Sequence, residues 1–171
     1  MKQLLILNPE NVTPEELTTY KVRHAARAVV VNADGKIAML FVAKENYYKL
    51  PGGGLEENED QVIALRRECQ EEIGTDVEVI SEVGIIEEYR KFDRLHQISF
   101  CYLAKPVGQP VATAYTLEEQ ESKFRAVWLS YEEAIQGIHE HVAHWIEGNE
   151  YAIPRDSTFL VEVKKLLHSK P

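Results

Sequence analysis

Apolar and polar residues alternate along the chain with two periods, and each period predicts one kind of element. Short runs rich in β-branched and aromatic residues predict strands. These runs occupy residues 4–9, 26–32, 36–43, 77–90, 95–108 and 124–130. The turn sequence Asn-Ala-Asp-Gly at residues 32–35 separates the second run from the third and predicts that these two runs form a β-hairpin.

Three other segments repeat their apolar residues every three or four positions, which is the period of an α-helix with one buried face. They are residues 59–73, 130–138 and 157–169, and the last two begin with Ser130 and Ser157, a residue type typical of a helix N-cap. Hairpin neighbours outnumber helical crossovers in this order of elements. The order therefore predicts an α/β/α sandwich with a mixed β-sheet.

The helix at residues 59–73 has clear end signals. Asn58 is a favourable N-cap and is followed three residues later by Gln61, as in a capping box, and Gly74 is the residue type that ends helices. At about 100° per residue, four apolar residues fall on one face. We expect this face to point into the core, and its residues are Val62, Leu65, Cys69 and Ile73.

Three carboxylates gather on the neighbouring sector of this helix, those of Glu68, Glu71 and Glu72. Glu68 and Glu72 are like charges four residues apart, and acidic residues in the last turn oppose the helix dipole. Arg67 can pair with Glu71, but the helix offers no basic partner one turn from the other two. A divalent cation would remove the repulsion, because Mg²⁺ and Mn²⁺ prefer carboxylate oxygens. A metal site is therefore favoured over a solvated acidic face.

A glycine-rich segment, Leu-Pro-Gly-Gly-Gly at residues 50–54, directly precedes this helix. Glycine backbone can approach a ligand closely and can adopt positive φ. Gly53 and Gly54 are therefore candidate phosphate contacts beside the metal, although a tight turn alone would also explain three glycines.

Composition narrows the class of protein. The chain has 171 residues, 44% of them hydrophobic, which suits one globular domain, and its net charge is -9 with a sequence pI near 5.2. This charge repels phosphate backbones, so we expect no long nucleic acid as a partner. The apolar runs are too short for a membrane span or a signal peptide. Cys69 and Cys101 are too few for a disulfide framework, which predicts reduced thiols and a cytoplasmic protein.

The residues from Gly53 to Thr75 resemble a known family signature. They are similar to the Nudix box, G-x5-E-x7-R-E-U-x-E-E-x-G-U, in which U is a bulky apolar residue. Every charged and glycine position is met, and two U positions hold Cys69 and Thr75 instead. The flanking sequence extends the resemblance over roughly residues 22–135. We therefore expect a single Nudix domain over residues 1–171, with an N-terminal strand in 1–21 and C-terminal helices in 136–171 as additions.

The resemblance implies a hydrolase that cleaves the diphosphate linkage of a nucleoside diphosphate derivative or a nucleoside triphosphate. It implies Mg²⁺, or Mn²⁺, as the cofactor and a small nucleotide as the partner. It also makes Glu68, Glu71 and Glu72 the metal ligands, and it makes Glu59 and Arg67 structural supports of the site. The alternative is a Nudix-fold module that senses a nucleotide without hydrolysing it, but the carboxylates that such modules usually lose are all present.

The general base stays open between two segments. Within the box, Glu71 and Glu72 are candidates. The later segment Leu-Glu-Glu-Gln-Glu offers Glu118, Glu119 and Glu121, of which we favour Glu119 or Glu121.

Residues outside the box are expected to select the substrate. Arg27 and Lys49, together with Arg23, are candidate phosphate contacts. Aromatic side chains that can stack on a base are Tyr89, Tyr47 and Tyr48.

The C-terminal region carries a second group of possible ligands, His139, His141 and His144. They do not form the sequence H-E-x-x-H, and surface histidines between two helices are the better interpretation. We expect residues 136–171 to cover the sheet or to form a homodimer contact.

Overall fold

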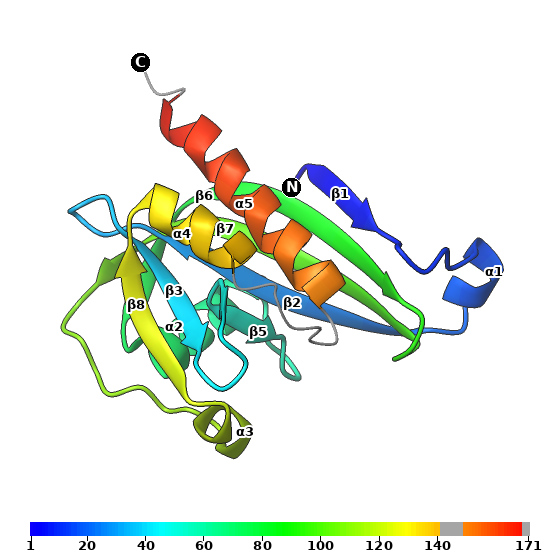
Figure 1. Cartoon of the computed structure of the whole chain (residues 1–171), viewed down its shortest axis with the longest axis horizontal. Coiled ribbons are helices and arrows are strands. Elements are labelled where there is room, and N and C mark those ends of the chain that lie inside the picture. Colours follow the sequence, from blue (N-terminus) through cyan, green and yellow to red (C-terminus); the bar gives the residue numbers. More distant parts are fainter. Residues whose placement is uncertain (141–148, 169–171) are drawn as a thin grey trace.

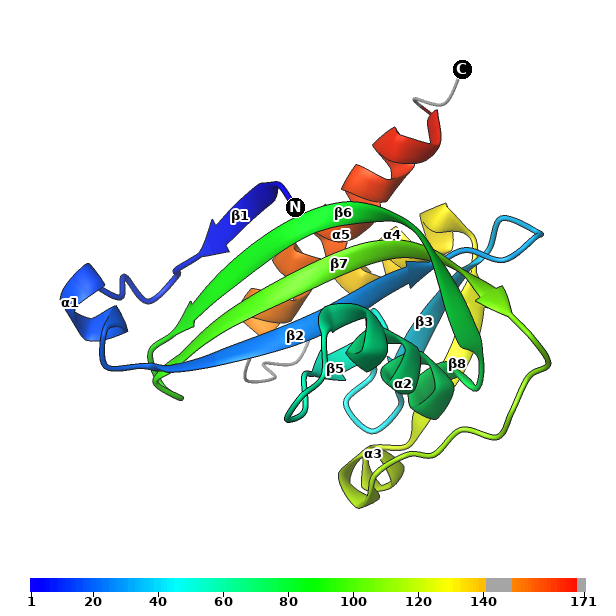
Figure 2. The same cartoon turned by 180° about the vertical axis from the view of Figure 1, so that it is seen from behind.

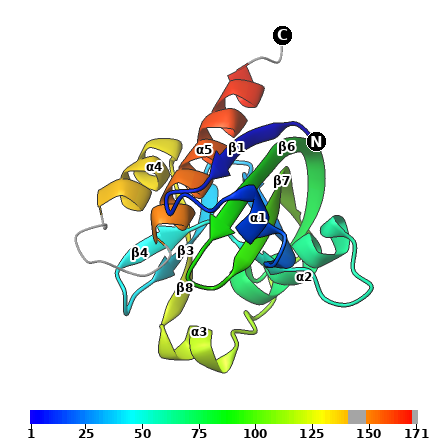
Figure 3. The same ribbon diagram turned by 90° about the vertical axis from the view of Figure 1, so that its right-hand side faces the viewer.

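The computed structural model describes residues 1–140 and 149–168, and these form three layers (Figure 1). Two β-sheets make up the middle layer. One helix covers one face of this layer, and two helices from the C-terminal part of the chain cover the other (Figures 2 and 3). The predicted α/β/α sandwich with a mixed sheet is thus confirmed.

The larger sheet has five strands, with the bounds β1 Gln3–Leu7, β2 Lys21–Val30, β5 Gly52–Gly54, β6 Asp76–Arg90 and β7 Leu95–Val107. Their order is β1-β6-β7-β2-β5. The β1–β6 and β7–β2 pairs are parallel, whereas β6–β7 and β2–β5 are antiparallel. Both kinds of pairing therefore occur within one sheet.

The smaller sheet is antiparallel and has three strands, with the bounds β3 Ile37–Val42, β4 Tyr47–Lys49 and β8 Phe124–Leu129. The hairpin predicted for residues 26–32 and 36–43 is therefore wrong beyond its turn. A single bridge joins Val31 to Ile37, after which β2 and β3 diverge into different sheets. Strand β3 is almost completely buried and β2 is buried from Ala25 onwards, and each pairs with a strand on both sides within its own sheet.

The helices have the bounds α1 Pro14–Leu17, α2 Gln61–Ile73, α3 Leu117–Glu121, α4 Tyr131–Glu140 and α5 Asn149–His168. Helix α5 begins before the predicted Ser157, because its buried face extends back to Tyr151, which is only 2% exposed. No helix in the described ranges is long and apolar enough to cross a membrane. His141 and His144 lie outside the described residues, and His139 contacts Ser157 on α5 at 3.2 Å.

The sheets bury an apolar cluster on each face. Helix α2 contributes Leu65, Cys69 and Ile73 to one cluster, and α5 contributes Phe159 and Leu160 to the other. The predicted stripe on α2 is correct from its second turn onwards, whereas Val62 in the first turn is 38% exposed. Both cysteines are free and buried, as expected. The two apolar clusters hold β2, β4 and α2 in place, and charged residues from these three elements line one cleft.

Candidate active site

The first glycine of the glycine-rich segment has the most restricted backbone. Gly52 lies in β5, has φ of +129°, and would place a Cβ 2.1 Å from the carbonyl oxygen of Ala26. Its N–H donates to Glu72 Oε2 at 2.6 Å, and its carbonyl accepts a hydrogen bond from Arg27. Gly52 therefore links α2 to β2. The sequence interpretation passed over it, although its place directly after Leu-Pro was a signal.

The next two glycines leave room for charged side chains. A Cβ on Gly53 would lie 2.3 Å from Glu68 Oε1, and one on Gly54 would lie 2.8 Å from Arg23 Nη2. Any side chain at these two positions would push a carboxylate or a guanidinium away. The sequence alone did not show that these charged groups lie against the glycines.

Helix α2 begins at a different cap from the predicted one. The side chain of Asp60 accepts hydrogen bonds from the N–H groups of Val62 and Ile63 at 2.9 and 2.8 Å. Asn58 instead lies in the preceding turn with φ of +67°. Gly74 ends the helix in the left-handed conformation, as predicted.

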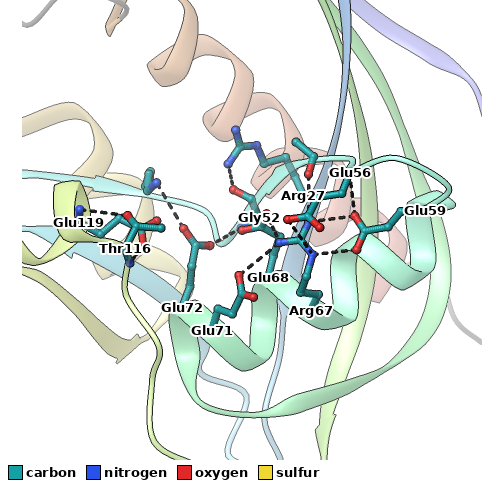
Figure 4. A network of polar contacts seen from close by, with 12 residues as sticks. Arg27, Gly52, Glu56, Glu59, Arg67, Glu68, Glu71, Glu72, Thr116 and Glu119 are labelled. Atoms are coloured by element: carbon teal, nitrogen blue, oxygen red, sulfur yellow. Dashed lines mark hydrogen bonds and ion pairs between the residues drawn. The ribbon is translucent and has the colours of Figure 1, made fainter.

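Arg67 is at the centre of a polar network (Figure 4). Its Nε and Nη2 donate to the two carboxylate oxygens of Glu59 at 2.8 and 2.9 Å, and Nη2 also donates to the Gly54 carbonyl at 3.1 Å. Its Nη1 donates to Glu68 at 2.8 Å and to Glu71 at 3.2 Å. All five N–H donors of the guanidinium are engaged. The hydrogen bonds from Arg67 lower the pKa of Glu59 to about 2.

Glu72 is almost completely buried, with 2% of its surface exposed. Besides the Gly52 N–H, it contacts Lys49 Nζ at 3.4 Å. Burial raises the pKa of Glu72 to about 7, against the opposing effects of Lys49 and the Gly52 N–H. The repulsion expected from the helix sequence is thus compensated in part by a lysine from β4.

The three box glutamates line one cleft, but they do not converge on one point. Within residues 1–140 and 149–168, no three Asp, Glu, His or Cys side chains form a group that could hold a metal ion. Arg67 draws Glu68 and Glu71 to its Nη1, while Lys49 and Gly52 hold Glu72. The expected convergence therefore needs side-chain rotation. The donor set still fits Mg²⁺ or Mn²⁺, because these ions prefer carboxylate oxygens. The same carboxylates already pair with the positive charges of Arg67 and Lys49.

The cleft has a volume of about 720 Å³ and is lined by residues from both sheets, α2 and α3. Box residues in its wall are Arg67, Glu68, Glu71, Glu72, Gly53 and Gly54. Candidates from outside the box that also line it are Arg23, Arg27, Lys49, Tyr47, Glu118 and Glu119. Burial lowers the pKa of Arg27, which is only 7% exposed, to about 10.

Two expected site residues lie away from the cleft wall. Tyr89 packs edge-on against His96 with ring centroids 5.0 Å apart, and it lies near the far end of β6. Glu121 is exposed at the end of α3. Tyr89 therefore does not line this cleft, because its distance along the sequence from the box does not fix its place on a long strand. Glu119 lines the cleft, but its carboxylate accepts from the Thr116 N–H at 2.8 Å and so caps its own helix.

Sequence reasoning also missed Phe124. Its ring lines the cleft and lies 4.4 Å from Lys49 Nζ. The available signal was its position as the first residue of the strand that follows the acidic segment.

The segment before α3 fixes the C-terminal end of α2. The N–H of Ala114 donates to the Glu71 carbonyl at 2.8 Å, and the Tyr115 hydroxyl donates to the Glu72 carbonyl at 3.0 Å. Carbonyls in the last helical turn have no partner within the helix. This segment supplies partners for the two residues whose carboxylates face the cleft.

An α/β/α sandwich in which a glycine strand leads into a helix carrying Arg67 and a row of glutamates is the architecture of a Nudix domain. The family model described as NUDIX domain matches residues 21–148. Because this match covers most of the chain, the protein belongs to the Nudix family. The predicted membership of this hydrolase family is therefore confirmed.

Relatives and solved structures agree with this assignment. The chain is 31% identical over 122 residues to the protein named 8-oxo-dGDP phosphatase NUDT18 from Danio rerio. That match covers 70% of the chain and 35% of the relative, so the chain spans about a third of the relative's length. Among solved structures, it is similar to the E. coli ORF135 protein, with a TM-score of 0.62, 23% identity, and coverage of 90% of this chain and 96% of that one.

Two further structures show the same fold. A MutT protein from Methanosarcina mazei Go1 matches with a TM-score of 0.59 and 16% identity over 89% of this chain and 99% of that one. A NUDIX hydrolase from Nitrosomonas europaea matches with a TM-score of 0.63 and 20% identity over 85% of this chain and 90% of that one.

Proposed function

We propose that the protein is a metal-dependent hydrolase that cleaves the diphosphate linkage of a small nucleotide. The observation that carries this proposal is one cleft with carboxylates of Glu68, Glu71 and Glu72 on its helical wall and the cations Arg27 and Lys49 on its strand wall. A volume of about 720 Å³ is within the usual range for a small-molecule site. Diphosphate oxygens need cations, and the metal needs carboxylates.

The three glutamates would hold Mg²⁺ or Mn²⁺, which supplies charge neutralisation at phosphate oxygens and a water of lowered pKa. Arg27 and Lys49 orient the diphosphate from the strand wall, with Arg23 beside Gly54 as a third cation. Lys49 leaves Glu72 when it takes up this role. Arg67 stays bound to Glu59 and keeps the loop in register with α2.

Among the candidate bases, Glu71 has the most accessible carboxylate on the α2 wall of the cleft, with 40% of its side chain exposed. It is held by a single contact to Arg67 Nη1 at 3.2 Å. A base must reach the attacking water, so we propose Glu71 before Glu119, whose carboxylate caps α3.

The relative's name points to nucleoside diphosphates with an oxidised purine as the first substrates to examine. The two buried free thiols suit a reducing compartment, and we propose that the reaction takes place in the cytoplasm.

The test is a panel of nucleoside di- and triphosphates and nucleoside diphosphate conjugates, including 8-oxo-dGDP, with Mg²⁺, with Mn²⁺ and with chelator. Phosphate and nucleotide release are both measured. We expect metal-dependent turnover of at least one compound, and Glu72→Gln should lower kcat by roughly 100-fold or more. Glu78→Gln is the matched control, because Glu78 is an exposed glutamate paired with Lys105 on the surface.

Equal turnover by the parent and by Glu72→Gln would refute the site assignment. Tight binding of a nucleotide without cleavage of any compound on the panel would favour the sensing module instead.

A further inference from the structure

Two adjacent charged residues of α5 are buried beneath the glycine segment. Arg155 is 3% exposed and Asp156 is 1% exposed. Buried charges are costly unless they are paired, so such a pair has specific partners. Neither residue lines the cleft, and the proposed hydrolysis does not account for them.

The partners of this pair lead in two directions. Arg155 Nη1 donates to Glu88 Oε1 on β6 at 3.0 Å, and Glu88 has no exposed surface. Arg155 Nε donates to Asp156 Oδ1 at 2.7 Å. The other oxygen of Asp156 accepts the backbone N–H of Leu50 at 2.9 Å. The pair thus ties strand β6 to the backbone just before the glycines.

Leu50 is two residues from Gly52, the residue that contacts both walls of the cleft. The intervening Pro51 has its carbonyl bound by the N–H of Ala28 at 3.0 Å, which limits its movement. Gly52 then donates to Glu72 and accepts from Arg27. A shift of Leu50 would therefore be passed to the carboxylate and to the guanidinium.

We propose that Asp156, held by Arg155, is a positioning residue for the active site, setting the backbone of residues 50–52 and through it the orientation of Glu72 and Arg27. This inference rests on the proposed function, since Glu72 is a metal ligand only there. The C-terminal helix thereby becomes part of the catalytic apparatus without touching substrate.

The main test compares Asp156→Ala with Asp156→Asn. Alanine removes the acceptor for the Leu50 N–H, whereas asparagine keeps an oxygen there. Lys164→Ala is the matched control, because Lys164 lies on the same helix in an exposed pair with Glu132. Three readouts are taken: Mn²⁺ affinity from the electron paramagnetic resonance of free Mn²⁺, the ¹⁵N NMR signals and hydrogen exchange of the Leu50 and Gly52 amides, and kcat and KM for the best substrate.

Groups that orient metal ligands typically alter affinity or rate by roughly 10- to 100-fold. We expect Asp156→Ala to weaken Mn²⁺ binding and lower kcat within this range, with KM changed much less. The Leu50 and Gly52 amides should shift and exchange faster. Asp156→Asn should restore part of the affinity, because its amide oxygen accepts the Leu50 N–H while its NH2 group cannot accept from Arg155 Nε. Lys164→Ala should match the parent in all readouts.

A folded Asp156→Ala protein with the parent's Mn²⁺ affinity and unchanged amide signals would overturn the inference. If this variant does not fold, Arg155→Lys carries the test, since lysine lacks the planar fork that donates to Glu88 and Asp156 together. A folded Arg155→Lys protein with the parent's Mn²⁺ affinity and kcat overturns the inference equally.

The two proposals fail differently. If the parent hydrolyses no compound, the proposed function fails, but the amide signals still report whether Asp156 sets the backbone. If the parent hydrolyses its substrate and Asp156→Ala does so equally well, the inference fails and the proposed function stands.

Discussion

At the scale of single residues, the site depends on the absence of a side chain at Gly52 as much as on the charged groups around it. The backbone of Gly52 is held between Ala26 and Glu72 in a conformation that other residues rarely adopt. The glycine therefore serves a steric purpose that its neighbours in the sequence do not share to the same degree.

Gly52→Ala should destabilise the protein by about 3 kcal/mol, because a Cβ would lie 2.1 Å from a backbone carbonyl and φ is strained. Gly35→Ala is the control with a positive φ of +74° but no atom within 4 Å of the added Cβ. That change should cost only about 1 kcal/mol. Urea denaturation measures both, and equal losses would show that strain in φ alone explains the effect.

Glu59 gives a prediction for pH. Its pKa is lowered to about 2 by the hydrogen bonds from Arg67, so folding favours the ionised form. The stabilisation it provides is present above its ordinary pKa near 4.5 and is lost as pH falls towards 2. Urea denaturation in the presence of chelator at pH 7, 4.5 and 3 should show parent and Glu59→Gln becoming more similar as pH falls. A stability difference independent of pH would contradict the ionic role.

At the scale of elements, the sequence predicts the existence and the C-terminal end of helix α2 correctly, but not the residue that caps its N-terminus. The sequence pattern places the N-cap at Asn58, three residues before Gln61, whereas the structure places it at Asp60. Backbone conformation decides between them, since a residue with φ of +67° cannot serve as the cap of this helix.

Asp60→Ala should therefore cost about 1 kcal/mol of stability, through loss of two capping hydrogen bonds. Asn58→Gly keeps the positive φ and should change stability by no more than a few tenths of a kcal/mol. Thermal and urea unfolding of the two variants distinguish the caps. The reverse ranking would restore the assignment made from sequence.

The long strands and α2 were predictable because each carries several repeats of its period. Strands β4 and β5 have three residues each, and α3 has five, which is too short for a periodic signal. The division into two sheets depends on pairing between distant segments, such as β3 with β8, and a local turn signal cannot report this. The box glutamates lie close together in the sequence, so a local motif identifies them. Lys49 meets Glu72 because the fold brings the end of β4 beside α2, which no local pattern reports.

At the scale of the whole molecule, helices pack on both faces of the layer that the two sheets form. The cleft is lined by residues from both sheets, α2 and α3, but by none from α4 or α5 among the described residues. Helix α5 contacts the glycine-rich segment through the hydrogen bond from the Leu50 N–H to Asp156. Because the cleft is built from both sheets and α2, metal binding there should raise the free energy of unfolding of the whole domain.

Mn²⁺ in 100-fold excess over its dissociation constant should stabilise the parent by about 2.7 kcal/mol, and chelator should reverse this. Glu72→Gln should lose most of the gain, while Glu78→Gln should keep it. Thermal unfolding followed by circular dichroism measures the shift in Tm. An equal shift in both variants would place the ion elsewhere.

The complete engagement of Arg67 bears on how the proposed nucleotide would lie in the cleft. The arginines and lysines that line the cleft are Arg23, Arg27, Lys49 and Arg67, and Arg67 has no N–H donor left to offer. Under the proposed function, a nucleotide in the cleft would therefore meet available cationic donors on the strand wall only. Its phosphates would lie along β2 and β4, and their other oxygens would face the glutamates of α2, where a metal ion would be needed between the two sets of negative charges.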